Sequence, residues 1–474
     1  MRMSFHFYNP TRIVFGSGTL NELGNQALPG KKALLLMSCG KSAKVSGAYD
    51  RTLEQLKKAG VEVAEFAKVM ENPLKDMVME GAAFARDNGC DFIVALGGGA
   101  VLDSATAISA MATNEGDLWD YVCGGTGKGK PLSRPGLPVV TITLTAGTAS
   151  EINCWGVISN PKTQEKIGFG DPMLNPVLAI VDPELMRTIP ARYTAYQGFD
   201  ALFHNTEVMM SNGVNILSET IALSAIRNIA MYLPRAVRDG HDLEAREHIA
   251  YGSTMAGMTM QLTSTTAQHS MEHSMSAYHH NLPHGAGLIM ISKAFAEFFM
   301  ERHACDAQFV KMARAMGMER ADKPQDFITA LVALQEACGA ADLNMSDYGF
   351  TPDEFMTLAK GARSMQGGLF AANPCEMTDE DCASTFEKSY REPKSTMGGR
   401  FGAHLPQLGN ARPKNQEVIM HILVLNGSPR PKGNTKQMVE AFREGALASG
   451  HQVTIVDVCR KKINGCLGCE HCHT

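Results

Sequence analysis

The sequence predicts an α/β part with a parallel sheet over residues 1–185, an all-α part over 186–404, and a short strand–helix–strand segment over 419–474. In the first part, short apolar runs alternate with amphipathic stretches, which is typical of a parallel sheet with crossover helices. Beyond Pro190 strand patterns are missing, and long stretches rich in Ala, Met, Leu and Glu follow a helical period. The polar stretch 405–418, with Pro and Gly, is predicted to be a linker.

The individual elements follow from these patterns in chain order. Apolar runs predict strands at 32–37, 92–96, 139–143 and 177–181, and helical spacing predicts helices at 50–59 and 104–112. In the second part, the same spacing predicts helices at 216–233, 266–277, 306–316 and 324–338. A new apolar strand at 419–425, and a helix at 436–449, open the last segment.

Composition excludes several classes of function. The chain has 474 residues and a net charge of −5, so it carries no excess of positive charge for nucleic acid or an anionic membrane. No apolar run approaches the roughly 20 residues of a spanning helix, and the first residues lack the apolar stretch of a secretory signal. We therefore expect a soluble, cytoplasmic protein.

The 12 cysteines are unevenly placed. Eight are scattered singly between Cys39 and Cys382, as expected for small buried side chains in a reducing compartment. The other four, at the end of the chain, are Cys459, Cys466, Cys469 and Cys472.

Histidines gather in one short stretch, where residues 269–284 hold five of the chain's 15. On a helix, His269 and His273 share one face, and Asp200 and His204 have the same spacing upstream. The pair of Asp200 and His204 alone is more typical of a surface or capping interaction, and the histidine-rich stretch alone is also consistent with weak adventitious metal binding. Helices that each present such a pair also build metal sites, and three imidazoles with one carboxylate suit Fe(II), Zn(II) or Ni(II). We therefore expect Asp200, His204, His269 and a later histidine, such as His284, to converge.

Two loops have the composition of phosphate-binding loops. Gly97-Gly98-Gly99 follows a predicted strand and precedes a helix, where backbone N–H groups and the helix N-terminus favour an anion. The stretch from Thr143 to Glu151 offers four hydroxyls around a glycine. Neither stretch fits the Gly-x-Gly-x-x-Gly dinucleotide fingerprint.

Taken together, these residues resemble a known family. Residues 1–404 resemble the iron-containing (group III) alcohol dehydrogenases. The matching motifs, in order, are Phe15-Gly16-Ser17-Gly18, Glu71-Asn72-Pro73, Gly97-Gly98-Gly99 with Asp103, Thr145-Ala146-Gly147-Thr148-Ala149-Ser150-Glu151, Asp182-Pro183, Asp200 with His204, His269 with His273, Pro283-His284-Gly285 and Ala372-Asn373-Pro374.

The resemblance implies a dehydroquinate synthase-like fold, with a dinucleotide-binding domain over 1–185, a helical metal-binding domain over 186–404 and the active site between them. It implies the metal ligands Asp200, His204, His269 and His284, and a catalytic role for His273. The implied cofactor-binding positions are Gly40, Asn72, Gly97, Gly98, Gly99, Asp103, Thr145, Thr148 and Lys166.

Three positions depart from the family pattern. Thr106 stands where a Lys is usual. The gap before Pro283-His284 is one residue longer, which leaves His279 and His280 as alternatives to His284 for the last ligand. Gly40 stands where NAD-preferring relatives have the Asp that holds the ribose. The loss of this carboxylate removes repulsion of a 2′-phosphate, and Lys41 and Lys44 are nearby, so the sequence favours NADP(H) over NAD(H).

The implied function is hydride transfer between NAD(P) and a small primary alcohol or aldehyde, assisted by Fe(II), in a homodimer or higher homo-oligomer. One alternative is a zinc-dependent polyol dehydrogenase of the glycerol type, and another is a metal- and nucleotide-binding redox sensor without turnover. A dehydroquinate synthase type shares the fold, but nothing in the sequence favours it.

The last segment, 419–474, resembles part of a flavodoxin-like NADPH-dependent FMN reductase or iron–sulfur flavoprotein. Its strand leads into the loop Asn426-Gly-Ser428-Pro-Arg430, which is similar to an FMN-phosphate loop. Cys466, Cys469 and Cys472 are similar to the compact cysteine motif of the flavoproteins, but Cys459 is poorly spaced as a fourth ligand. We expect an incomplete unit that does not bind FMN. The alternatives are flavin binding completed by other residues, and adventitious metal binding by these cysteines with His471 and His473.

Overall fold

The computed structural model describes residues 2–391, 421–426, 439–440, 442–443, 446–447 and 452–457. The chain divides into two units, Met1–Ser395 and Thr396–Thr474. The predicted linker 405–418, the rest of the proposed FMN-phosphate loop after Asn426, and Cys459, Cys466, Cys469 and Cys472 lie outside the described residues.

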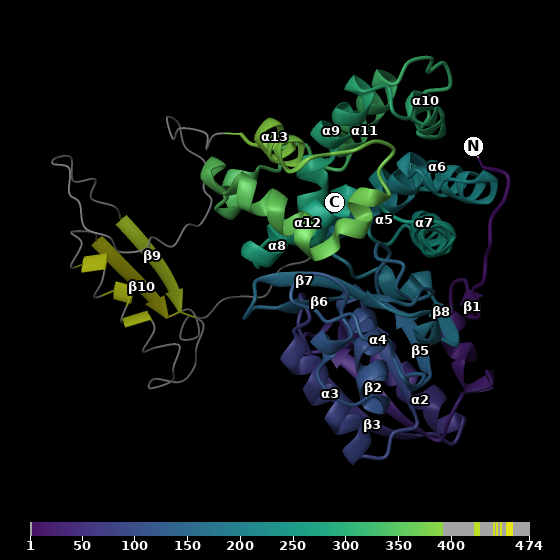
Figure 1. Cartoon of the computed structure of the whole chain (residues 1–474). Coiled ribbons are helices and arrows are strands. Elements are labelled where there is room, and N and C mark those ends of the chain that lie inside the picture. The colour runs from purple at the N-terminus through teal and green to yellow at the C-terminus, as the bar shows by residue number, and fades with distance from the viewer. Residues whose placement is uncertain are drawn as a thin grey trace. The chain divides into compact units, whose positions relative to one another are not determined.

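A six-stranded parallel sheet forms one half of the first unit, which we call the sheet part (Figure 1). Its order is β1-β8-β5-β4-β2-β3, with β1 (Arg12–Phe15), β2 (Lys32–Ser38), β3 (Glu62–Val69), β4 (Phe92–Gly97), β5 (Val139–Thr143) and β8 (Leu178–Val181). The four predicted strands are the four inner ones. The two strands missed by the sequence, β1 and β3, lie at the edges. Edge strands are half-exposed, so they lack a continuous apolar run.

The order of the strands locates a binding edge. The chain passes from β2 outward to β3 and then crosses back to β4 on the other side of β2. Strand order therefore reverses between β2 and β4, and in open α/β sheets ligands bind at the carboxyl ends of the strands at such a point. Gly40 follows β2, and Gly97–Gly99 lie at the end of β4.

Both faces of the sheet are covered, as parallel sheets require. Alternate side chains of β2 point to opposite faces of the sheet. Leu35 belongs to the same apolar cluster as Leu56 of α2, and Leu34 to the same cluster as Val78 of α3 and Val101 of α4. The elements of this part outside the sheet are η1 (Thr19–Asn25), α1 (Ser42–Val45), α2 (Ala48–Lys58), α3 (Lys75–Asp87), α4 (Gly99–Thr113), η2 (Leu118–Asp120), the antiparallel hairpin β6 (Trp155–Asn160) and β7 (Glu165–Gly170), η3 (Pro172–Leu174) and η4 (Pro183–Met186). Helix α4 begins five residues earlier than the predicted helix at 104–112, directly on the glycines.

Helices make up the rest of the first unit, which we call the helical part. They are α5 (Ala191–Met210), α6 (Ile216–Arg238), α7 (Leu243–Leu262), α8 (Ala267–Tyr278), α9 (His284–Glu301), α10 (Asp306–Ala315), α11 (Gln325–Ala337), η5 (Met345–Tyr348), η6 (Pro352–Glu354), α12 (Phe355–Ala371) and α13 (Asp379–Ser389). All four predicted helices are present, and each end lies within five residues of the predicted one. Buried aromatic side chains such as Phe199, Phe203, Phe295 and Phe299 fill the core between them.

Among the described helices, α6 alone is long and apolar enough to cross a membrane, and a third of its apolar stretch is buried. Its buried side chains, including Ala222, Ile226, Ile229 and Leu233, belong to the core of the helical part. It also contains Pro234 and ends with Arg235 and Arg238. One face of α6 therefore packs into the core of the helical part.

The second unit contains strand β9 (His421–Asn426), which pairs in parallel with β10 (Gln452–Asp457). Residues 439–440, 442–443 and 446–447 between them are helical. Parallel strands need a crossover connection, which is usually a helix. The predicted strand–helix–strand arrangement is therefore confirmed for the described residues.

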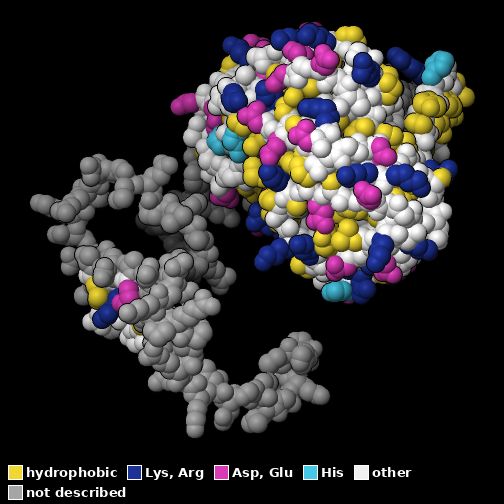
Figure 2. Space-filling model, turned by 90° about the horizontal axis from the view of Figure 1, so that it is seen from below, with side chains coloured by type: hydrophobic (Ala, Val, Ile, Leu, Met, Phe, Trp, Pro, Cys, Tyr) yellow, Lys and Arg dark blue, Asp and Glu magenta, His cyan; other side chains and the backbone are white. Residues whose placement is uncertain are grey.

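On the face of the first unit in Figure 2, Lys and Arg side chains are interspersed with Asp and Glu. The described side chains on this face form no large field of one sign, which agrees with the near balance of charge in the sequence.

Candidate active site

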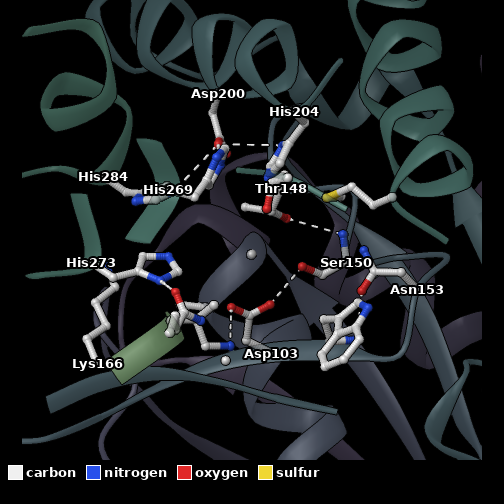
Figure 3. A pocket seen from close by; sticks show the side chains of 18 of the residues that line it. Asp103, Thr148, Ser150, Asn153, Lys166, Asp200, His204, His269, His273 and His284 are labelled. Atoms are coloured by element: carbon white, nitrogen blue, oxygen red, sulfur yellow. Dashed lines mark hydrogen bonds and ion pairs between the residues drawn. The ribbon is translucent and has the colours of Figure 1, made fainter. Parts of the chain in front are cut away.

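A cavity of about 310 Å³ lies between the sheet part and the helical part, both within the first unit (Figure 3). Residues of both parts line it. From the sheet part they include Asn72, Gly99, Ala100, Asp103, Thr148, Ser150, Asn153, Trp155 and Lys166; from the helical part they include Asp200, His204, Met260, Thr263, His269, His273, His284 and Gln366. The predicted metal ligands and five of the nine predicted cofactor residues thus line one space.

The three predicted histidine ligands surround one carboxylate oxygen of the fourth, Asp200. Oδ1 of Asp200, on α5, lies 3.5 Å from Nε2 of both His269 on α8 and His284 on α9. Nδ1 of His204 lies 3.6 Å from the same oxygen. The donor atoms of Asp200, His269 and His284 lie within 4.8 Å of one another. His204 is outside that set of three, and its ring stacks on His269 with 4.4 Å between centroids.

Two of the imidazoles have a hydrogen-bond acceptor on the side away from Asp200. Nδ1 of His269 donates to Glu207 at 2.5 Å, and Nδ1 of His284 donates to Glu272. In His204 the same Nδ1 that faces Asp200 lies 3.2 Å from the carbonyl oxygen of Gly147. Such partners fix the tautomer of metal-binding histidines and leave Nε2 as the ligand atom. Asp200 Oδ1 and His269 Nε2 are buried without a hydrogen-bond partner. This donor set fits a divalent transition-metal ion.

The charges of the site also fit a divalent cation. Three buried carboxylates, on Asp200, Glu207 and Glu272, contact the imidazoles, and the buried ammonium of Lys166 lies 3.6 Å from Glu272. Burial opposes ionisation of Asp200, but the imidazoles of His204, His269 and His284 hold its pKa well below the usual value. Burial likewise opposes protonation of His269, but Glu207 and Asp200 raise its pKa to about 10. The field of the site therefore attracts positive charge.

His273 differs from its neighbours on α8. Burial, helped by the charge of Lys166, holds its pKa well below the usual value, so the ring is neutral. Nδ1 lies 2.6 Å from Oε1 of Gln366, at a break in helix α12. An amide oxygen only accepts, so Nδ1 carries the proton and Nε2 is an acceptor. His273 thus presents Nε2 as a hydrogen-bond acceptor.

The two glycine- and hydroxyl-rich loops pack directly against each other. A Cβ on Gly98 would lie 2.8 Å from Cγ2 of Thr145, and one on Gly99 would lie 2.3 Å from Cγ2 of Thr148. Only glycine permits this approach, which brings the N-terminus of α4 to the cavity. A Cβ on Gly147, in the second loop, would lie 3.1 Å from Asp200. The loop therefore connects the cofactor side of the cavity with the metal side.

Asp103 lies on the first turns of α4, facing the cavity. Ser150 Oγ donates to it at 2.7 Å and the Val157 N–H at 3.0 Å. Burial nevertheless raises its pKa to about 6. The carboxyl group therefore carries little charge at slightly acid pH, which suits a position beside a phosphate or a ribose hydroxyl.

Some predicted cofactor residues lie apart from the cavity lining. Gly97, Gly98 and Thr145 stand behind it, and Gly40 is exposed after β2. Asn72 and Lys166 line the cavity, but Lys166 Nζ donates to Ser276 on α8 at 2.8 Å.

The three candidates for the last ligand differ in position. His279 contacts Glu354 at 2.9 Å and the carbonyl oxygen of Tyr348 at 3.1 Å, and His280 is exposed. His284 alone of the three lines the cavity.

Sequence reasoning missed Glu207, Glu272 and Gln366. The sequence could have predicted Glu207, because it lies three residues after His204 on the same helix and therefore on the same face. Glu272 precedes His273 directly, and its inward direction follows from the burial of α8 on all sides. Gln366 could not have been predicted, because it reaches His273 through a local break in α12.

Comparisons with known proteins agree with this geometry. Residues 10–183 match the family model for iron-containing alcohol dehydrogenase, and residues 194–390 match that for its C-terminal domain. Residues 420–474 match the model for NADPH-dependent FMN reductase.

Individual relatives cover most of the first unit. The chain is 33% identical over 377 residues to a probable NADH-dependent butanol dehydrogenase of Bacillus subtilis, covering 77% of this chain and 95% of that protein. It is 33% identical to a 1,3-propanediol dehydrogenase of Klebsiella pneumoniae, covering 81% and 99%. The solved structure of an archaeal alcohol dehydrogenase from a Red Sea brine pool matches with a TM-score of 0.78 and 32% identity, covering 82% of this chain and 100% of that one. The chain belongs to the iron-containing alcohol dehydrogenase family.

Proposed function

We propose that the protein interconverts small primary alcohols and aldehydes with NAD(P)(H) and Fe(II). The observation that carries this proposal is the oxygen Oδ1 of Asp200. It is buried and unpartnered, and two imidazole Nε2 atoms lie 3.5 Å away in the cavity that the N-terminus of α4 also lines.

Asp200, His204, His269 and His284 would hold the metal ion. Bound there, Fe(II) supplies Lewis-acid stabilisation of negative charge on the alcohol oxygen, and the nicotinamide supplies the hydride acceptor. Glu207 and Glu272 keep His269 and His284 in the tautomers that present Nε2.

Other residues of the cavity position the nucleotide and the substrate or transfer a proton. Gly99 and Thr148 shape the binding edge at the N-terminus of α4, where a pyrophosphate is favoured. His273 receives the hydroxyl proton at Nε2 during alcohol oxidation and returns it during aldehyde reduction. Met260 and Trp155 supply apolar surface to the cavity, which favours displacement of water by substrate.

Steady-state kinetics on metal-defined protein tests this proposal. Chelation should abolish aldehyde reduction, and Fe(II) should restore it more fully than Zn(II). Activity that is indifferent to EDTA would overturn the proposal, and restoration by Zn(II) alone with glycerol as the best substrate would favour the polyol alternative. Tight cofactor binding without turnover on any short aldehyde would favour the redox sensor.

For the nucleotide, we propose a preference for NADP(H), although relatives are named as NADH- or NAD-dependent. Gly40 is exposed at the carboxyl end of β2, where a carboxylate would repel a 2′-phosphate. The ratio of kcat/KM for NADPH and NADH decides this point.

We also propose a homo-oligomer, in a cytoplasmic setting. The N-terminal segment before β1 exposes Met3, Phe5, Phe7 and Tyr8, by 40% to 73%. An apolar cluster of this kind is typical of an interaction surface. Light scattering measures the molar mass of the full chain and of a Phe5→Ser, Phe7→Ser variant. The same mass for both proteins would show that these residues do not mediate oligomer formation.

For the last segment, we propose that the purified protein carries no FMN. The match of residues 420–474 to the FMN reductase model covers the strand–helix–strand arrangement. Flavin absorbance in the purified, denatured and filtered protein would contradict this.

A further inference from the structure

We infer that Glu272 and Lys166 form a positioning pair that ties the sheet part to the metal ligand His284. This inference rests on the proposed function, because it concerns the affinity of the proposed metal site. Neither residue is a proposed metal ligand, and neither would touch the ion.

The contacts of Glu272 place it behind His284. Its side chain is completely buried on α8, and one oxygen accepts the hydrogen bond from Nδ1 of His284. A carboxylate only accepts, so the proton of the imidazole stays on Nδ1 and the lone pair of Nε2 faces Asp200 Oδ1, 3.5 Å away. Loss of such a partner typically weakens metal binding by about 10- to 100-fold.

A buried carboxylate needs a compensating charge, and Lys166 provides it. Its Nζ lies 3.6 Å from the same oxygen of Glu272 and donates to Ser276 Oγ, one turn further along α8, at 2.8 Å. The carboxylate of Glu272 is therefore held in place from two sides, by the imidazole of His284 and by the ammonium of Lys166.

The pair connects elements that are far apart in the chain. Lys166 belongs to β7 of the hairpin in the sheet part, whereas Glu272 and Ser276 belong to the helical part. Lys166 also lines the cavity on the cofactor side. The position of the hairpin thus bears on the orientation of a metal ligand.

Glu207 supports a metal ligand without any contact to the sheet part, which makes it a useful comparison with Glu272. It supports His269 in the same way, but its further partners are the backbone N–H and hydroxyl of Thr266, at 2.7 and 2.8 Å, within the helical part. Only the support of His284 passes through a charged group of the sheet part.

Co²⁺ binding tests the pair without any measurement of turnover. The dissociation constant is measured by chelator competition, and the visible spectrum reports the coordination of Co²⁺. We expect Glu272→Gln, which keeps an acceptor oxygen but loses the charge, to weaken binding about tenfold, and Glu272→Leu about 100-fold with an altered spectrum. We expect Glu272→Asp to recover part of the loss.

Two further variants make the test specific. Glu151→Gln is the matched control, since it also removes a fully buried carboxylate, bonded at 2.9 Å to Thr254 and apart from the cavity lining; its Co²⁺ affinity should equal that of the unmodified protein. Lys166→Met should weaken binding in the unmodified background but not in Glu272→Gln, because the two side chains act as one unit.

The measured affinities distinguish failure of the proposed function from failure of the positioning pair. If the unmodified protein binds no Co²⁺, the proposed function fails. If it binds one ion and Glu272→Gln and Glu272→Leu both bind within twofold of it, the positioning pair fails and the proposed function stands. If Glu272→Leu does not fold by circular dichroism, the near-isosteric Glu272→Gln decides alone.

Discussion

Replacement of either of two histidines on α8 separates metal binding from proton transfer. His269 and His273 lie one turn apart and are each 4% exposed, so truncation to Ala leaves a similar buried space in both variants. The cost in stability should be similar, about 2–4 kcal/mol for a large buried side chain. The two variants are therefore controls for each other.

Their effects on the metal should differ sharply. His269 Nε2 lies 3.5 Å from Asp200 Oδ1, whereas His273 is directed at Gln366 by its Nδ1 and is not expected to bind the ion. Removal of a supporting residue alone costs up to about 100-fold in affinity, so removal of a ligand should cost more than about 100-fold, or about 2.7 kcal/mol. His273→Ala should change the affinity by less than about threefold and lower kcat by about 100-fold or more.

Metal analysis after dialysis, chelator competition and steady-state aldehyde reduction at saturating metal measure these quantities. Equal loss of metal in both variants would refute the division of roles. So would a His273→Ala enzyme with unchanged kcat.

Other variants probe the cofactor side and the interior. Gly99→Ala should raise KM for the nucleotide about tenfold, since its Cβ would lie 2.3 Å from Cγ2 of Thr148 and displace the start of α4; an unchanged KM would contradict the role of that edge. Gly40→Asp should lower kcat/KM for NADPH about tenfold relative to NADH by repulsion of the 2′-phosphate, and no change in the ratio would remove the basis for the NADP(H) preference. Burial raises the pKa of Glu151 from 4.5 to about 6, so stability present below pH 4.5 is lost as pH rises to about 6; Glu151→Gln should remove this loss, about 2 kcal/mol, in urea titrations at about pH 4 and pH 8, and an identical pH dependence of both proteins would refute it.

How far the sequence predicts the fold depends on where each element lies. The inner strands β2, β4, β5 and β8 are continuous apolar runs, and the sequence locates all four. It misses the edge strands β1 and β3 and the hairpin β6–β7, whose residues mix polar and apolar types because one side is exposed or faces the cavity. The hairpin matters most, since it carries Lys166.

For the site, spacing along helices predicts which donors can share a face, and resemblance supplies their roles. Asp200, His204, His269 and His284 all line one cavity, as predicted. What spacing cannot supply is the second layer of contacts. Glu272 contacts His284 and Lys166 only because α8, α9 and β7 meet in three dimensions, and no local pattern encodes that meeting.

The most direct test is the position of a bound ion beside the nicotinamide. A crystal of the protein with NADP and Zn²⁺, measured at the zinc absorption edge, should show one anomalous peak about 2.0–2.2 Å from Asp200, from a ring nitrogen of His204 and from Nε2 of His269 and His284. A peak on the Glu272 and His273 side of His284, or anywhere away from Asp200, would contradict the account.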